Sequence, residues 1–141
     1  MKRWLIPATV AAAAFVFGGS ALGQLRADFG RFEYENNCLA CHGAKGRGDG
    51  YFAEYLKLPM PDLTTVTQRN GGVFPADRMQ RIIDGREELK GHGPRHMPIW
   101  GAHYNDRARE YFKGTAYDSE AYIRVRVLSL VDYLYSIQNQ R

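Results

Sequence analysis

The feature that most constrains this chain is the run Cys38-Leu39-Ala40-Cys41-His42, which has the pattern C-x-x-C-H. The spacing lets both cysteine sulfurs face the same side of one helical turn. A histidine directly after such a pair is typical of c-type haem attachment, in which each sulfur forms a thioether with one haem vinyl group. The histidine is then positioned to offer an imidazole nitrogen to the iron. We therefore predict that Cys38 and Cys41 bind haem c covalently and that His42 is the proximal iron ligand.

Other uses of the two cysteines fit the sequence less well. A thioredoxin-like dithiol is expected in a βαβ context, and no such pattern surrounds Cys38. A structural zinc site needs two further ligands at suitable spacing, and the chain has only these two cysteines. A disulfide between Cys38 and Cys41 would close a loop too short to add much stability.

Length and charge exclude several classes of protein. A chain of 141 residues has room for one domain with a single core. The isoelectric point of about 9.2 is basic, but the lysines and arginines are scattered, so we do not expect a nucleic-acid-binding protein. Removal of Lys2 and Arg3 with a leader would lower the formal net charge of +4 by two, and two haem propionates would bring it near zero.

The first 23 residues have the layout of a secretory signal peptide. Lys2 and Arg3 form a positive start, an apolar run follows over residues 4–18, and small residues fill positions 19–23. We predict that residues 1–23 direct export and that the remaining domain occupies residues 28–141.

Cleavage is predicted after Ala21 or Gly23, because Pro7 and the alanine-rich, glycine-ended tail favour removal. The alternative is an uncleaved anchor, since residues 4–23 are just long enough to span a bilayer. Either way we expect a periplasmic domain. A membrane contact, to the inner membrane, is expected only if the leader is retained.

A helix is predicted over residues 28–41, with Asp28 as its cap. Gly30, Tyr34 and Cys38 lie four positions apart and therefore share one face. Glycine weakens a helix by about 1 kcal/mol, so we expect another element to approach closely at Gly30.

The rest of the chain reads as further helices joined by loops. The glycine-rich segment 42–50 is expected to pass close over a face or edge of the haem. No stretch alternates as a strand, so the predicted fold class is all-α. The remaining predicted elements are a helical turn at 51–58, a short helix at 62–69 capped by Asp62, a helix from Pro75 to Asp84 ended by Gly85, a helix at 105–112, and a last helix capped by Ser119.

From about residue 28 onward the sequence resembles the class I cytochrome c family. The spacing Gly30-x-x-x-Tyr34-x-x-x-Cys38 is similar to the N-terminal helix of that family. Leu130 and Tyr133 resemble the leucine and aromatic residue of its C-terminal helix. The resemblance implies that these two helices cross near Gly30 around one covalently bound haem.

Two further segments resemble a bacterial, exported subgroup of small monohaem cytochromes. They are the loop over residues 42–50 and the run Pro61-Asp62-Leu63-Thr64. In the family a proline carbonyl supports the proximal histidine, and Pro59 and Pro61 are the candidates. The segment 101–118 is longer than in compact members, and could cover the haem or form a docking surface.

Met97, followed by Pro98, resembles the distal methionine of the family. The resemblance therefore implies that Met97 is the second axial ligand of the iron. Met60 is a rival, although its position matches a segment that usually forms a wall of the site. Met79 is expected in the core. His92, His96 and His103 would instead give ligation by two histidines, and an open sixth position is the remaining alternative.

The resemblance implies a one-electron carrier that exchanges electrons with redox protein partners and is not itself an enzyme. A second hypothesis keeps the fold but makes the chain the haem-c subunit of a dehydrogenase, reductase or oxidase complex. A third hypothesis is a ligand-binding or peroxidase-like protein with an open sixth site. Trp100, Tyr51, Tyr55 and Tyr104 are candidates for hydrogen bonds to a haem propionate.

Overall fold

The structure is a computed structural model that describes residues 18–56, 59–87, 99–115 and 118–139. Within these ranges the chain forms helices, turns and loops and no strand, so the predicted all-α class is confirmed. The elements in chain order are α1 (Gly18–Asn37), α2 (Leu39–His42), η1 (Ala53–Tyr55), η2 (Leu63–Thr65), α3 (Val66–Arg69), α4 (Ala76–Asp84), α5 (Trp100–Tyr111) and α6 (Ser119–Ser136).

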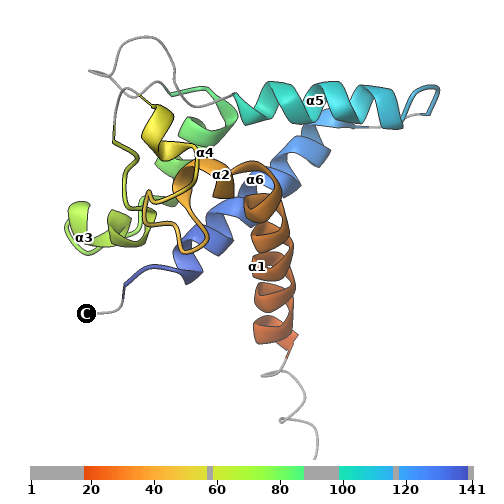
Figure 1. The fold of residues 1–141 in the computed structure, drawn as a ribbon. Coiled ribbons are helices and arrows are strands. Elements are labelled where there is room, and N and C mark those ends of the chain that lie inside the picture. The colour runs from red at the N-terminus through yellow and green to blue at the C-terminus, as the bar shows by residue number, and fades with distance from the viewer. Residues whose placement is uncertain (1–17, 57–58, 88–98, 116–117, 140–141) are drawn as a thin grey trace, which may run out of the picture.

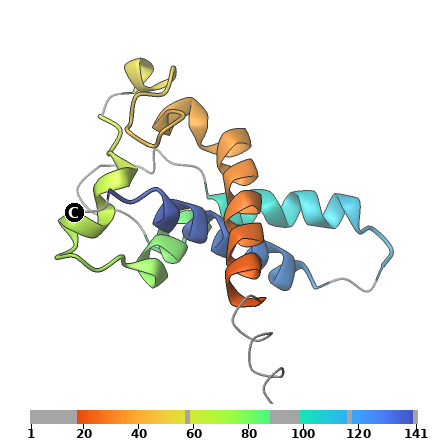
Figure 2. The ribbon, with the colours of Figure 1, turned by 90° about the horizontal axis from the view of Figure 1, so that it is seen from below.

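Helices α1 and α6 cross in the middle of the molecule, as both views show (Figures 1 and 2). The contact is closest at Gly30, where an added Cβ atom would overlap the carbonyl oxygen of Ser129. One turn further along, the Tyr34 ring packs against Tyr133 with 5.1 Å between ring centroids. The predicted close approach at Gly30 is therefore confirmed, and the missing side chain is what allows the two backbones to meet.

The hydrophobic core lies beside this crossing and combines residues from both ends of the chain. Helix α6 contributes most, because its buried side chains recur at helical spacing. Met79 packs against this core, as predicted. The buried core residues are Tyr34, Leu63, Ile83, Tyr104, Val127, Leu130, Val131 and Leu134.

Helix α5 lies against the first half of α6 and against the end of α4, and its far end projects away from the core (Figure 1). Tyr104 and Ala108 are buried, whereas Tyr111 near the far end is 84% exposed. Gly101 lies against the backbone of Asp84, where a larger residue would crowd the carbonyl oxygen. The first half of the segment 101–118 is thus part of the packed domain.

The C-terminal end of the described chain is hydrogen-bonded to η2 and to the start of α3. The Gln138 side chain accepts a hydrogen bond from the backbone N–H of Thr67 at 2.9 Å and donates one to the Leu63 carbonyl at 2.8 Å. The backbone N–H of Asn139 donates to the Thr64 carbonyl at 2.9 Å. These bonds hold η2 and α3 against the end of α6.

The start of the first helix differs from the prediction. Asp28 lies inside α1, where it accepts a hydrogen bond from the Gln24 side chain at 2.9 Å, and it does not cap the helix. Residues 24–27, directly before Asp28, are good helix formers, so the helix continues back through them, and its first residue, Gly18, lies in the predicted leader.

Two other helix starts were predicted wrongly, whereas two features were predicted correctly. Asp118, not Ser119, caps α6 by accepting bonds from the backbone N–H groups of Glu120 and Ala121. Helix α5 begins at Trp100, five residues before the predicted start. The cap by Asp62 is confirmed, since its carboxylate accepts from the Thr64 backbone N–H at 2.8 Å. Gly85 ends α4 in the left-handed conformation, as predicted.

None of the helices in the described ranges is both long and apolar enough to cross a membrane.

Candidate haem site

The C-x-x-C-H run forms a separate helical turn immediately after α1. Cys38 follows the last residue of α1, and its N–H donates to the Tyr34 carbonyl at 2.8 Å. The N–H of His42 then donates to the Cys38 carbonyl at 2.9 Å, which closes the turn as α2. Both cysteines are half-buried, and no disulfide joins them. The local fold therefore leaves both thiols available at the end of the helix that meets α6.

The His42 imidazole is enclosed by protein on its Nδ1 side. This nitrogen is buried and has no hydrogen-bond partner among the described residues. Burial lowers the pKa of His42 below its ordinary value, and the Pro61 carbonyl opposes that shift by favouring the protonated ring. Of the two candidate prolines, Pro61 is therefore the one whose carbonyl acts on His42. A neutral imidazole supported in this way is the form that can bind iron.

The glycine-rich loop after His42 folds back on its own neighbours. Gly43 and Gly48 both have φ of 80°, a region that other residues rarely adopt. An added Cβ at Gly48 would meet the carbonyl oxygen of Met60, and one at Gly50 would meet that of Ala40. Contacts within the protein thus require these glycines, and the expected passage of the loop over the haem stays a prediction.

A hydrogen bond ties this loop to α1, since the Tyr34 hydroxyl donates to the Gly43 carbonyl at 2.7 Å. Tyr34 therefore connects the α1–α6 crossing with the residue directly after His42. Burial raises the pKa of Tyr34 well above its ordinary value, so the hydroxyl remains a donor at neutral pH.

The other predicted ligands fall in different places. Met97, His92 and His96 lie outside the described residues. Met60 is half-buried, and its backbone packs against Gly48 as part of the loop wall. His103 is exposed on α5 with its ring edge-to-face to Trp100 at 5.5 Å. The described part of the site therefore consists of Cys38, Cys41 and His42 with Pro61 behind the ring.

The residues predicted to hydrogen-bond a haem propionate differ in their exposure. Tyr51 and Tyr55 are exposed. Tyr104 is buried, and its hydroxyl donates to the Glu33 carboxylate at 2.9 Å, so that hydroxyl already has an acceptor within the protein.

Sequence reasoning missed a buried polar cluster beside Cys38, formed by Glu33, Arg126, Tyr104 and Asn37. Glu33 is only 1% exposed, and its carboxylate pairs with the guanidinium of Arg126. The signal that could have revealed it was an acidic residue next to Tyr34 on the inner face of α1, with an arginine next to Val127 on the crossing helix. Pairing of opposite charges is expected where both are withdrawn from water.

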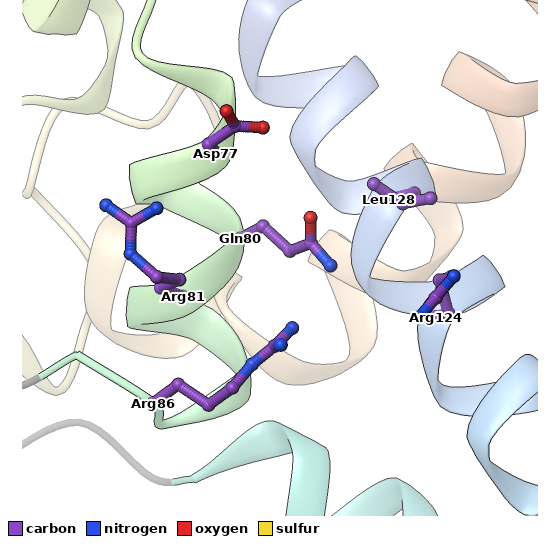
Figure 3. A pocket seen from close by; sticks show the side chains of 6 residues that line it. All are labelled: Asp77, Gln80, Arg81, Arg86, Arg124 and Leu128. Atoms are coloured by element: carbon purple, nitrogen blue, oxygen red, sulfur yellow. The ribbon is translucent and has the colours of Figure 1, made fainter.

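A surface groove between α4 and α6 lies apart from the C-x-x-C-H residues. Figure 3 shows Gln80 pointing from α4 toward Arg124 and Leu128 on α6. Two arginines at its edge are already paired: Arg81 on α4 with Glu87 at 3.0 Å, and Arg86, just after α4, with Asp84. Balanced charges and polar walls make this groove unsuited to an apolar macrocycle.

The helical fold and the C-x-x-C-H turn at the end of a crossing helix define a protein built to carry a covalently bound haem. The family model for cytochrome c matches residues 29–111, which is more than half of the chain. The chain therefore belongs to the cytochrome c family, and it is a haem-c electron-transfer protein. Searches of curated proteins and of solved structures gave no match.

Covalently bound haem c is the cofactor of this family, and the described residues fit it. Two thiols outside any disulfide stand on one helical turn, and the histidine beside them has an unpartnered buried nitrogen next to a carbonyl. Among the described residues, no group of three or more His, Cys, Asp or Glu side chains offers a competing metal site.

Proposed function

We propose that the protein is an exported one-electron carrier whose single haem is attached to Cys38 and Cys41, with His42 and Met97 as axial ligands. The observation that carries this proposal is the C-x-x-C-H turn, with its half-buried His42 near the Pro61 carbonyl, in a chain of the cytochrome c family. The haem supplies a ferric–ferrous couple that takes up and releases one electron.

The protein residues in this proposal hold the cofactor without a change of ligand. Cys38 and Cys41 fix the macrocycle to α2, and Pro61 orients the His42 ring. A methionine sulfur favours ferrous iron and raises the reduction potential relative to a second histidine. Retention of both axial ligands avoids a large rearrangement when the electron moves. We expect transient docking to donor and acceptor proteins through a small interface.

The proposed location is the periplasm, with the leader either removed or retained as an anchor in the inner membrane. The basic start and the apolar run of residues 4–18 support export. Fractionation of producing cells and mass spectrometry of the purified N-terminus would test this. A cytoplasmic protein with an intact leader would contradict it.

Absorption spectra of the ferric and ferrous protein, with and without carbon monoxide, test the ligand assignment. A low-spin spectrum with the far-red methionine–ferric charge-transfer band, unchanged by carbon monoxide, is expected. Met97→Leu should abolish that band, whereas the control Met60→Leu should retain it. High-spin iron that binds carbon monoxide readily would contradict the assignment and favour a ligand-binding protein.

Size-exclusion chromatography of native extracts addresses the alternative of a subunit in an oxidoreductase complex. A free carrier elutes at the size of the monomer or of a small oligomer. Elution of the haem absorbance with a large assembly would favour the subunit.

A further inference from the structure

We propose that the ion pair between the buried Glu33 and the half-buried Arg126 biases the haem toward its ferric state, because the negative end of the pair lies on the side of Cys38. The proposal deepens the assignment of Cys38 as a haem-bearing residue and rests on that assignment. Glu33 would act on the haem through space, by the electrostatic effect of its carboxylate.

The Glu33 carboxylate is completely hydrogen-bonded inside the protein. One oxygen pairs with the Arg126 guanidinium. The other accepts from the Tyr104 hydroxyl at 2.9 Å and from the Asn37 side chain at 3.2 Å. Three donors on two oxygens, one of them a guanidinium, suit an ionised carboxylate. The pair is therefore a fixed dipole, held between α1, α5 and α6.

The carboxylate end of this dipole lies toward the haem attachment residue. The guanidinium of Arg126 lies over the ring of Phe29, one turn before Glu33 on α1, whereas Cys38 follows Glu33 at the other end of this helix. Asn37, which bonds to Glu33, is the residue directly before Cys38. The negative charge is thus closer to the attachment site than the positive one.

The guanidinium end is turned toward aromatic rings. The central carbon of Arg126 lies 4.4 Å from the ring centroid of Tyr122, 5.3 Å from that of Tyr104 and 5.7 Å from that of Phe29. Contacts of this kind stabilise a cation away from water. The rings hold the guanidinium in place while it pairs with Glu33.

The sign of the effect follows from the charge of the iron. The ferric haem carries one more positive charge than the ferrous haem, so a fixed negative charge nearby stabilises the ferric form. The side chain of Glu33 is 2% exposed and that of Arg126 is 22% exposed, so their charges are screened less than charges on the open surface. The pair would lower the reduction potential and partly offset the effect of a methionine ligand.

The test is the midpoint potential of the holoprotein by spectroelectrochemical titration. Glu33→Gln keeps the shape of the side chain and removes its charge, so the potential should rise. We expect a several-fold to tenfold change in the ferric-to-ferrous ratio, where tenfold corresponds to about 59 mV. The matched control is Glu35→Gln, which removes the same charge two residues away on the exposed face, where Glu35 pairs with Arg31. This control should leave the potential unchanged.

Variants of Arg126 test the other charge of the pair. Arg126→Gln leaves the carboxylate without its cation and should lower the midpoint potential. Arg126→Lys retains the positive charge, so its midpoint potential should lie close to that of the original protein. If Glu33→Gln does not fold, Tyr104→Phe provides the test, because it removes one donor from the carboxylate and should lower the potential slightly.

Two outcomes would overturn the proposal, and they can be told apart from failure of the site assignment. Equal potentials of Glu33→Gln and the original protein, with lower stability, would make the cluster purely structural. A rise of the same size in Glu35→Gln would make the effect one of net charge alone. The pyridine haemochrome spectrum of Cys38→Ser reports separately on attachment, because loss of one of the two thioethers leaves a free vinyl group that shifts the α band; an unshifted band would contradict the assignment itself.

Discussion

Helix α1 meets the rest of the protein in two places that differ in chemistry. At Gly30 its bare backbone lies against the backbone of Ser129 on α6, without a polar side chain between them. At Glu33, one turn later, a buried carboxylate joins α1 to Tyr104 on α5 and Arg126 on α6. The first contact depends on shape alone, and the second on matched charges and donors.

The difference shows two ways in which neighbouring helices are joined to α1. The α1–α6 crossing brings backbones together on the face of α1 that contains Gly30. Helix α5 instead reaches α1 through the hydroxyl of Tyr104, which donates to Glu33. A buried polar contact of this kind specifies one arrangement, since any other would leave a charge unpaired.

The largest expected effect comes from filling the crossing. Gly30→Val would push a side chain into the Ser129 carbonyl, which belongs to the backbone and cannot move aside. We expect the free energy of unfolding to fall by at least about 3 kcal/mol, at the upper end of overpacking effects. Urea titration followed by far-UV circular dichroism measures this. A loss below about 1 kcal/mol would show that the helices separate easily.

Alkaline pH should weaken both contacts together. Burial raises the pKa of Tyr34 and of Tyr104, and the nearby charge of Glu33 contributes further for Tyr104. The folded protein therefore keeps these protons while an unfolded chain releases them above pH about 10, so stability is complete below that pH and is lost as the pH rises.

Urea midpoints at pH 8 and pH 11 test this sign. Each variant should reduce the loss of stability between these two pH values. Tyr34→Phe removes the contribution of the tyrosine at the α1–α6 crossing, and Tyr104→Phe removes that of the tyrosine on α5. The idea fails if the double variant loses as much stability between the two pH values as the original protein.

A smaller effect, confined to one region, is expected for Tyr104→Phe at neutral pH. The variant keeps the ring in the core but removes the hydroxyl that donates to Glu33. We expect a loss of about 1 kcal/mol in unfolding free energy. Hydrogen exchange should be faster for amides of α5 and unchanged for those of α1 near Gly30. Uniformly faster exchange would mean that the two regions open as one unit.

The smallest effect is expected on the outer face of α1. Arg31 pairs with Glu35 at 2.8 Å, but both side chains are exposed, and such pairs add little stability. Arg31→Ala should leave the urea midpoint within experimental error. A clear loss would indicate that surface charge supports the crossing.

The sequence was informative wherever an interaction depends on regular spacing. Helical spacing marks three features of the sequence: the motif at Cys38, the glycine at position 30 and the apolar stripe of the last helix. The structure has a helix at each of them, namely α2, α1 and α6. The turn residues Asp62 and Gly85 were also predictable, because capping and left-handed conformations favour few residue types. Met97 stays a prediction, since it lies outside the described residues.

The remaining errors have two physical causes. Helix starts at Gly18, Trp100 and Ser119 were missed because several neighbouring residues could serve as caps, and packing decides between them. The contact of Glu33 with Arg126 was missed because it joins positions far apart in the chain, and no local pattern marks a charge that will be buried.

The hydrogen bonds of Gln138 and Asn139 to η2 have a consequence for the timing of folding. These residues, like Ser129 opposite Gly30, are synthesised after their partners. The parts of the domain made first therefore have no partner until α6 has been synthesised, since synthesis proceeds from the N-terminus. A nascent chain that ends before α6 would expose the inner face of α1 and leave Pro61 and its neighbours without support. The domain closes as a late event, when its two ends meet.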